Sequence, residues 1–215
     1  MMYGRDQALE LLHRVLAQVE ADEAEATLLT EDLALTRFAN SVIHQNVANR
    51  NTSLAVRAVV NGSIGLALTN RLDAEGQRWV TGQALTIARL GTPDPDYPGL
   101  PAGGTIRPAT TYFESTATMT ALQRAKAVRT IVDAAAGQGF SATGAYRTEV
   151  SELAIANTAG ATAYTPLTLA ALRTVVDANP PQGVGFLTGY ADAISRDADQ
   201  IEVEAIAERA VAKCA

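Results

Sequence analysis

Residues 54–68 read LAVRAVVNGSIGLAL and carry the clearest structural signal in the chain. Apolar side chains alternate on both sides of Asn61-Gly62, which is the pattern of two antiparallel strands joined by a two-residue turn. Asn and Gly suit a type I′ turn because both of its central residues need a positive φ. The sequence therefore predicts a β-hairpin here, and the other elements can be placed on either side of it.

Helical periodicity surrounds this hairpin. Apolar residues recur at the spacing of one helix face in four stretches, at 6–20, 74–91, 121–135 and 199–215. Asp73 is placed to cap the second helix, and Gly91 is placed to end it. In the fourth helix Asp199 and Glu202 have capping-box spacing, and the apolar stripe continues to Cys214. We expect these helices to flank a sheet.

The remaining strand-like runs are short and are separated by Asn, Gly, Pro and acidic residues. Two of them, Thr27–Leu29 and Leu33–Phe38, are predicted on either side of a polar turn at 30–32. Later strands are predicted at 140–146, 152–156, 161–164, 168–176 and 184–187. With the helices, these runs predict an α+β fold with a mainly antiparallel sheet and flanking helices.

Segment 92–117 is predicted to be a long loop. Five prolines and the pair Gly103-Gly104 interrupt any helix or strand there. Asp94 and Asp96 alternate with prolines, a pattern that either presents two carboxylates to a cation or forms a stiff turn. Loops of this length in compact domains tend to be functional or mobile, so we expect a linker, a lid or a partner-binding segment.

Two short matches at one offset suggest an internal repeat. They pair Leu33-Ala34-Leu35 with Leu153-Ala154-Ile155, and Ile64-Gly65-Leu66 with Val184-Gly185-Phe186, so that 33 corresponds to 153 and 64 to 184. The hypothesis is that two similar helix-sheet-helix halves, 1–91 and 118–215, share one antiparallel sheet and are joined by the loop 92–117. The alternative is chance similarity among alanine-rich strands.

Charge and composition narrow the range of partners. The chain has 17 basic and 23 acidic residues, a net charge of −6, and 5% aromatic residues. The acidic balance and the scarcity of stacking side chains argue against nucleic acid, and the charge also argues against an anionic membrane. No apolar run has the length of a membrane span, and no signal peptide is evident. The single cysteine, Cys214, suits a reducing compartment, so the protein is predicted to be cytoplasmic.

The sequence offers little for catalysis. It contains no Gly-x-Ser-x-Gly elbow, no Walker loop and no His-Glu-x-x-His pair. Two histidines and one cysteine are few donors for a zinc site. His13 lies off the apolar stripe of its helix and is predicted to be solvated, whereas Cys214 lies on a stripe and is predicted to be a core residue. The sequence therefore predicts neither catalytic nor metal-binding residues in this chain.

The segment TRFANSVIHQN, residues 36–46, is the densest cluster of hydrogen-bonding side chains. It lies where a predicted strand breaks up. Candidate peptide-binding residues are Arg37, Asn40, His44 and Asn46, whose side chains could line a groove for an extended peptide. The alternative is a polar strand end whose Asn side chains satisfy backbone groups.

The same segment resembles the amino-terminal signature of the TldD/PmbA family. The hairpin end GLALTN at 65–70, the helix after Asp73, and the loop from TPDPD at 92–96 to Leu100-Pro101 follow in the family's order. The resemblance spans essentially the whole chain and is strongest from Thr36 to Pro101. It implies that residues 1–215 are the amino-terminal domain of a longer protein whose carboxy-terminal domain is rich in strands.

The family's activity supplies the expected function. Family members pair as TldD with PmbA, also called TldE, and the pair processes or degrades unfolded peptides in an enclosed cavity. TldD supplies a zinc motif, His-Glu-x-x-x-His, which neither His13 nor His44 begins. The resemblance therefore implies a cytosolic zinc-peptidase complex in which this chain contributes cavity wall and dimer surface rather than catalysis, with zinc held by the catalytic partner or beyond residue 215.

Two further expectations concern the subunit and its role. The TPDPD loop is closer to the PmbA side of the family, which lacks the zinc motif, and the expected partner is a TldD/PmbA-type subunit in a homo- or heterodimer. The family is also associated with DNA gyrase, although the acidic charge argues against direct DNA contact. The alternative function is a non-enzymatic scaffold module that binds peptides or proteins.

Overall fold

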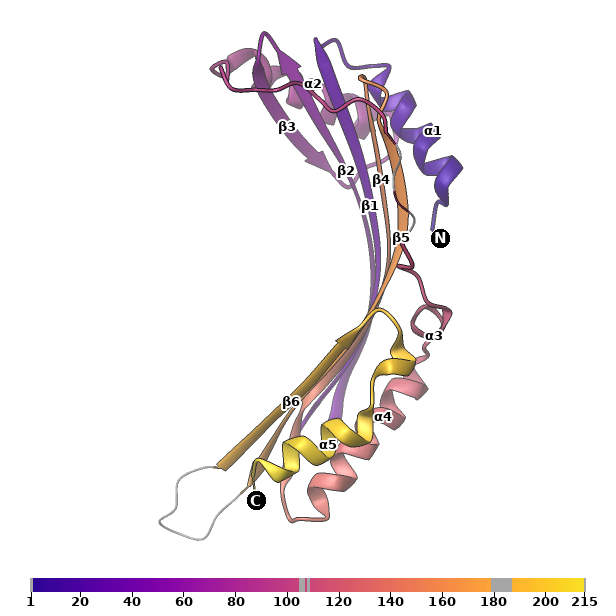
Figure 1. Ribbon diagram of the computed structural model, residues 1–215, viewed down its shortest axis with the longest axis vertical. Coiled ribbons are helices and arrows are strands. Elements are labelled where there is room, and N and C mark those ends of the chain that lie inside the picture. The colour runs from indigo at the N-terminus through magenta and orange to yellow at the C-terminus, as the bar shows by residue number, and fades with distance from the viewer. Residues whose placement is uncertain (1, 105–106, 108, 179–186, 215) are drawn as a thin grey trace. The chain divides into compact units, whose positions relative to one another are not determined.

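A computed structural model describes residues 2–104, 107, 109–178 and 187–214 of the chain. Its elements are α1 (Arg5–Leu16), β1 (Glu23–Ala39), β2 (Val42–Val60), β3 (Ser63–Thr69), α2 (Ala74–Leu90), α3 (Glu114–Ala117), α4 (Ala121–Ala136), β4 (Ser141–Asn157), β5 (Thr162–Ala178), β6 (Leu187–Ser195), the 3₁₀ helix η1 (Ala198–Gln200) and α5 (Val203–Ala212). The strands form one sheet in the order β3-β2-β1-β4-β5-β6. The predicted α+β fold with an antiparallel sheet and flanking helices is confirmed (Figure 1).

The chain divides into two compact units, and each is assembled from three separate segments. Unit 1 comprises Met1–Glu31, Arg50–Ala109 and Ser151–Pro166. Unit 2 comprises Asp32–Asn49, Thr110–Val150 and Leu167–Ala215. Apart from the one between 109 and 110, these boundaries fall inside β1, β2, β4 and β5, so each of these long strands contributes residues to both units. The units therefore do not coincide with the halves 1–91 and 118–215.

The core of unit 1 lies between α1, α2 and one face of the strands. Alternate residues of β1, among them Ala26 and Leu28, are buried against this core. The predicted hairpin is confirmed: Asn61 and Gly62 have φ values of 50° and 75°, and Val60 pairs with Ser63. A turn of this kind keeps the right-handed twist of the two strands and so fixes their register.

The core of unit 2 lies under α4 and α5, which run side by side across one face of the strands (Figure 1). Val128 and Ile131 of α4 and Ile206 of α5 pack there against Tyr146 of β4. A capping box starts α4, because the Thr120 hydroxyl accepts the Gln123 N–H while the Gln123 side chain accepts the Thr120 N–H. The predicted helix 121–135 is thus confirmed with a cap that fixes its start.

The order of elements repeats along the chain. A helix, three strands and a helix occur as α1-β1-β2-β3-α2 and again as α4-β4-β5-β6-α5. The third strand of each repeat is an edge strand of the sheet, and it approaches the backbone of the following helix at a glycine. A Cβ atom at Gly65 would lie 2.0 Å from the Ala84 carbonyl oxygen, and one at Gly189 would lie 1.9 Å from that of Ala210. Of the sequence matches, Val184-Gly185-Phe186 lies outside the described residues.

Long strands account for the main differences from the predicted elements. The predicted turn at 30–32 is wrong, because β1 runs without interruption through it. Thr30 is fully buried and its Oγ1 accepts a hydrogen bond of 3.3 Å from the Thr52 hydroxyl, so a polar side chain is satisfied inside the sheet. For the same reason the predicted strands 140–146 and 152–156 are parts of β4, and 161–164 and 168–176 are parts of β5.

The carboxy-terminal helix begins later than predicted. The capping box at Asp199 and Glu202 is wrong, because Asp197 instead caps the short η1 and α5 starts at Val203 without a side-chain cap. Its inward face is as predicted: Ile206, Ala207, Ala210 and Cys214 are buried. Of the predicted strand 184–187, only Leu187 lies among the described residues, where it opens β6.

The first part of the loop 92–117 is fastened to unit 1. Asp94 forms a stiff turn with the residues after it, because its Oδ1 accepts the Asp96 N–H at 3.0 Å. Further along, Glu23 accepts hydrogen bonds from the Tyr97 hydroxyl at 2.7 Å and from the Leu100 N–H. Burial and this bond to Glu23 raise the pKa of Tyr97 to about 12. The loop between Asp94 and Leu100 is therefore anchored to the start of β1.

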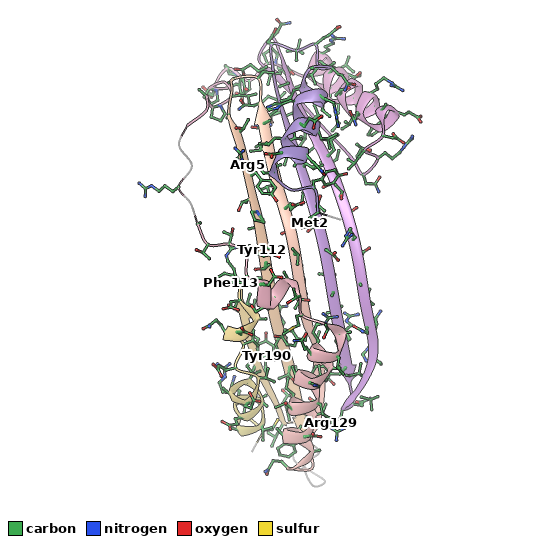
Figure 2. The ribbon with its side chains drawn as sticks, turned by 90° about the vertical axis from the view of Figure 1, so that its right-hand side faces the viewer. Met2, Arg5, Tyr112, Phe113, Arg129 and Tyr190 are labelled. Carbon is green, nitrogen blue, oxygen red and sulfur yellow. The ribbon has the colours of Figure 1, made fainter. Side chains whose placement is uncertain are left out.

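The last part of the loop is fastened to unit 2. Tyr112 and Phe113 lead into α3 (Figure 2), and the Phe113 N–H donates to the Thr168 hydroxyl at 3.0 Å. Thr116 then donates to the Arg196 carbonyl oxygen at 2.8 Å.

Among the helices of the described residues, none is long and apolar enough to cross a membrane.

Candidate functional site

The structure places the four predicted peptide-binding residues around the β1–β2 turn without bringing them into one site. Asn40 occupies the turn itself with a φ of 48°, and its N–H donates to the Thr143 hydroxyl at 3.4 Å. His44 is exposed on β2. Arg37 and Asn46 make separate contacts that place them on opposite faces of the sheet. A peptide-binding role for these residues stays a prediction.

Asn46 is exposed, but its side chain joins a network centred on the buried Arg124 of α4. Its Oδ1 accepts from the Thr36 hydroxyl at 3.1 Å and lies 3.5 Å from the Arg124 guanidinium. Arg124 also donates to Thr36, to Thr148 and to the Met119 carbonyl oxygen. Burial lowers the pKa of this guanidinium, and within the described part of the chain no carboxylate forms an ion pair with it. The network joins α4 to the sheet and has a structural role.

Arg37 lies on the sheet face that points away from α4 and α5. Side chains alternate along a strand, and both of its neighbours, Thr36 and Phe38, are buried on the side of the helices. Arg37 lines a hollow of about 310 Å³, which we call the arginine hollow. Its lining residues are Leu35, Arg37, Ala145, Arg147, Leu169, Ala171, Arg173 and Ile194.

Three neighbouring strands each contribute one guanidinium to the arginine hollow. Arg37 comes from β1, Arg147 from β4 and Arg173 from β5. Arg147 forms an ion pair with Glu149, and Arg37 donates to the Gln45 side-chain oxygen at 3.4 Å. The remaining lining residues are aliphatic. The hollow therefore combines a positive floor with apolar walls, in a chain whose net charge is −6.

The acidic groups near this hollow leave two of its arginines without an ion pair. Asp192 of β6 is the cross-strand partner of Arg173. No ion pair within 4.0 Å that involves Arg37 or Arg173 is found in the described residues. Exposed guanidiniums of this kind are free to bind a carboxylate through paired N–H donors.

A second hollow, of about 520 Å³, lies in unit 1. We call it the tryptophan hollow, and it is lined by Asn51, Ser53, Leu68, Thr69, Asn70, Arg71, Gly76 and Trp79. Trp79 is the only tryptophan of the chain, and it is 53% exposed. The lining offers an aromatic ring, two side-chain amides and a leucine, which suit an apolar group that carries a few hydrogen-bonding atoms.

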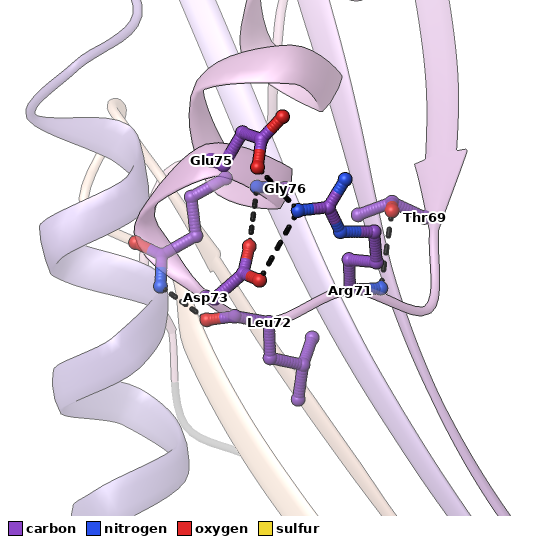
Figure 3. Close-up of polar contacts among 7 residues, drawn as sticks. Thr69, Arg71, Leu72, Asp73, Glu75 and Gly76 are labelled. Atoms are coloured by element: carbon purple, nitrogen blue, oxygen red, sulfur yellow. Dashed lines mark hydrogen bonds and ion pairs between the residues drawn. The ribbon is translucent and has the colours of Figure 1, made fainter.

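Charge in the tryptophan hollow is already compensated at the amino end of α2 (Figure 3). The Arg71 guanidinium donates to Glu75 at 2.6 Å and to Asp73 at 3.3 Å, and these bonds raise its pKa. Asp73 caps the helix as predicted, by accepting the Gly76 N–H at 2.7 Å. That bond, followed by the one from Arg71, lowers the pKa of Asp73. Arg71 is thus held by two carboxylates, unlike the arginines of unit 2.

The described residues do not fit a metal centre. His13 is exposed on α1, as predicted, and Cys214 is buried, with its thiol donating to the Val176 carbonyl oxygen at 2.8 Å. In the described ranges, no three side chains of His, Cys, Asp or Glu gather closely enough to hold a metal ion. The described surface offers guanidinium groups, aliphatic side chains and edge-strand backbone for binding.

Comparison with known protein families shows which family this chain is related to. Residues 111–214, which contain α4, β4, β5, β6 and α5, match the sequence model of the PmbA/TldA metallopeptidase central domain. The chain belongs to the TldD/PmbA family. The family expected from the TRFANSVIHQN segment is therefore confirmed. No curated protein sequence matches this TldD/PmbA chain.

Three solved structures share the fold of this TldD/PmbA chain. TldE from Thermococcus kodakarensis matches with a TM-score of 0.84 at 18% identity, over 95% of this chain and 46% of its own. A candidate modulator of a DNA gyrase from Thermotoga maritima matches with 0.82 at 18%, over 96% and 47%. A candidate modulator of DNA gyrase from Bacteroides thetaiotaomicron matches with 0.86 at 14%, over 98% and 50%. The chain thus spans about half of each of these proteins.

Sequence reasoning found Arg37 but missed Arg147 and Arg173. Each of the three lies between two residues that are buried on the side of the helices, as in Tyr146-Arg147-Thr148 and Leu172-Arg173-Thr174. This alternation marks each arginine as facing away from the core. The strand order that brings the three together is a property of the fold, and local sequence does not specify it.

Proposed function

We propose that this chain is the amino-terminal domain of a component of a cytosolic zinc-peptidase complex that processes or degrades unfolded peptides. The observation that carries the proposal is the match of residues 111–214 to a metallopeptidase central domain. The chain would contribute wall and subunit surface, and a TldD/PmbA-type partner or the remainder of the protein would supply the zinc. The TPDPD loop and the likeness to a TldE fold favour the PmbA/TldE subunit.

Peptide holding is the role that the surface supports. β3 and β6 are the edges of the sheet, and an edge strand can pair with an extended peptide through its backbone. Pairing of this kind accepts many sequences because it uses main-chain groups. On β6, Tyr190 and Ile194 are exposed beside that edge and offer apolar contact to the side chains of a peptide.

Subunit contact is supported by β3. Ile64, Leu66 and Leu68 are 40–58% exposed, and they share the face of this strand that points away from the core of unit 1. A row of exposed aliphatic side chains is typical of a surface that another protein covers. We assign it to the TldD/PmbA-type partner subunit.

The test compares cleavage of an unfolded, fluorescently labelled peptide by three samples, each with and without a chelator. The samples are this chain alone, a TldD-type partner that carries His-Glu-x-x-x-His, and the full-length protein mixed with that partner. We expect no cleavage by the chain alone and chelator-sensitive cleavage that is faster in the mixture than with the partner alone. Cleavage by the chain alone would contradict the proposal.

A non-enzymatic scaffold is the second candidate. It is favoured by the two hollows, which suit binding, and by the described residues that do not fit a metal centre. The same assay separates the two functions. A scaffold binds the peptide but does not raise the rate of cleavage above that of the partner alone at any ratio of the two proteins.

A further inference from the structure

We infer that the arginine hollow is a carboxylate-binding subsite that selects acidic residues of an extended peptide. The inference rests on the proposed function, because the ligand is a peptide that lies on the face of β1, β4 and β5 pointing away from α4 and α5. It adds a preference that backbone pairing alone does not provide. The ligand class is a peptide carboxylate with aliphatic neighbours, carried either by Asp and Glu side chains or by the carboxy terminus.

The geometry supports a carboxylate. Arg37, Arg147 and Arg173 line one hollow of about 310 Å³, and they stand on β1, β4 and β5, which are adjacent in the sheet. Guanidinium groups bind carboxylates through two parallel N–H donors, so more than one arginine can share a single anion. Their own side chains are exposed, so a ligand reaches them without a rearrangement of the core.

The walls favour a peptide over other anions. Leu35, Leu169 and Ile194 surround the charged floor and suit aliphatic side chains next to an acidic one. The residues that line the hollow include no aromatic ring for stacking on a nucleobase. A peptide that alternates acidic and aliphatic residues matches both parts of the hollow.

Two acidic residues near the arginine hollow affect how strongly it binds a carboxylate. Glu149 is paired with Arg147, so Arg37 and Arg173 are the main groups for the ligand. Asp192 lies opposite Arg173 across β5 and β6 and competes with an incoming carboxylate. Removing this competitor with Asp192→Asn is therefore expected to tighten the binding of an acidic peptide, whereas it would weaken binding if Asp192 itself held the ligand.

The experiment measures binding of short labelled peptides to the whole chain by fluorescence anisotropy. One peptide alternates Leu and Glu, and a second alternates Leu and Gln; both have blocked ends. A third has the Leu-Gln sequence with a free carboxy terminus. We expect the Leu-Glu peptide to bind about tenfold more tightly than the blocked Leu-Gln peptide, since a charge-assisted hydrogen bond contributes about that much. The third peptide shows whether a terminal carboxylate serves equally.

Matched variants assign the preference to the hollow. The double variant Arg37→Gln/Arg173→Gln is expected to bind both blocked peptides equally. The control Arg89→Gln/Arg129→Gln removes the same charge from exposed positions on α2 and α4 and is expected to keep the tenfold preference (Arg129 is labelled in Figure 2). All four sites are exposed, so the unfolding midpoints of the two variants should agree with that of the parent protein.

Each other outcome would overturn the inference. Equal binding of the Leu-Glu and Leu-Gln peptides to the parent protein refutes the subsite and leaves peptide holding intact. Binding of neither peptide refutes the subsite and the proposed function together. Loss of the preference in the control variant as well shows that long-range charge, rather than the arginine hollow, selects the peptide.

Discussion

The two units pack their helices and strands in the same way, but the hollows on their surfaces differ in charge. Both pack helices on one face of the strands, and in both an edge strand meets a helix backbone at a glycine, Gly65 or Gly189. Their hollows differ: Trp79 and a neutralised Arg71 line the one in unit 1, whereas three arginines line the one in unit 2. The difference indicates that the glycine contacts belong to the shared fold, whereas the hollows carry the binding specificity.

Each unit also buries a charged side chain, and the two charges have opposite signs. In unit 1 Glu152 accepts hydrogen bonds from the Tyr3 and Gly4 N–H groups, at 2.7 and 2.8 Å, and from the Tyr164 hydroxyl at 2.6 Å. Burial, followed by this bond, raises the pKa of Tyr164. In unit 2 a positively charged side chain is buried instead. It is that of Arg124, whose guanidinium donates hydrogen bonds to neutral acceptors. Both ionisable side chains are therefore satisfied by hydrogen bonds to neutral groups.

The largest expected effect tests the shared framework. Gly65→Ala and Gly189→Ala should each lower the free energy of unfolding by about 3 kcal/mol or more, because the new methyl group would collide with a helix carbonyl oxygen. Gly82→Ala is the control: apart from the backbone of its own helix, no atom lies within 4 Å of its added Cβ, and it should stabilise α2 by about 1 kcal/mol. Urea unfolding of the three variants measures this. A cost at only one of the two strand glycines would contradict the shared construction.

The next effect tests the buried charges. Arg124→Ala should lower the free energy of unfolding by about 3 kcal/mol, because it leaves the Met119 carbonyl oxygen without a described donor and empties a buried volume. Glu152→Gln keeps the size of the side chain but replaces one of its two acceptor oxygens by a donor that faces either the Tyr3 or the Gly4 N–H group, and it should cost about 2 kcal/mol. Urea unfolding again provides the values. A neutral result at Arg124 would contradict its role in joining α4 to the sheet.

Much of this fold was predictable from local sequence because turns and helix caps mark where several of its strands and helices begin or end. Asn61-Gly62 predicted the hairpin correctly, and Asp73 predicted the start of α2. Predictions failed where a polar residue is satisfied inside a long strand. The sequence predicts a turn at Thr30 because it does not show that Thr52 lies beside it.

The candidate site was predictable only in part. Arg37 is a candidate from the sequence because it lies in a polar segment, yet the other candidates Asn40 and Asn46 contact other parts of unit 2. Arg147 and Arg173 are distant in sequence and meet Arg37 only because β1, β4 and β5 are adjacent. Strand order depends on contacts across the whole sheet, so no local pattern specifies this cluster.

A pH experiment compares the buried tyrosine of unit 2 with its replacement. Burial, followed by the charge of Asp199, raises the pKa of Tyr146 to about 12, above its usual value of 10.0. The folded state therefore favours the protonated phenol, and this stability is fully present below about pH 10 and is lost as the pH rises toward 12. In Tyr146→Phe the free energy of unfolding should fall less over this range. An identical alkaline decline in both proteins would contradict the assignment.

The smallest expected effect tests whether the hollows act separately. Trp79 is the only tryptophan, so its emission reports on the tryptophan hollow alone. None of the residues that line the arginine hollow lines the tryptophan hollow. Saturation with the Leu-Glu peptide should therefore leave the emission maximum unchanged. A blue shift on binding would show that the peptide also buries Trp79, and the division of roles between the units would be wrong.

Amide hydrogen exchange tests most directly whether the edge strand β6 pairs with a peptide. The measurement compares the whole chain with and without a saturating unfolded peptide, and follows β6, Leu187–Ser195, against the helix α4 as an internal reference. Backbone pairing at the edge predicts slower exchange in β6 and no change in α4. Exchange in β6 that is unaffected by bound peptide would contradict the account.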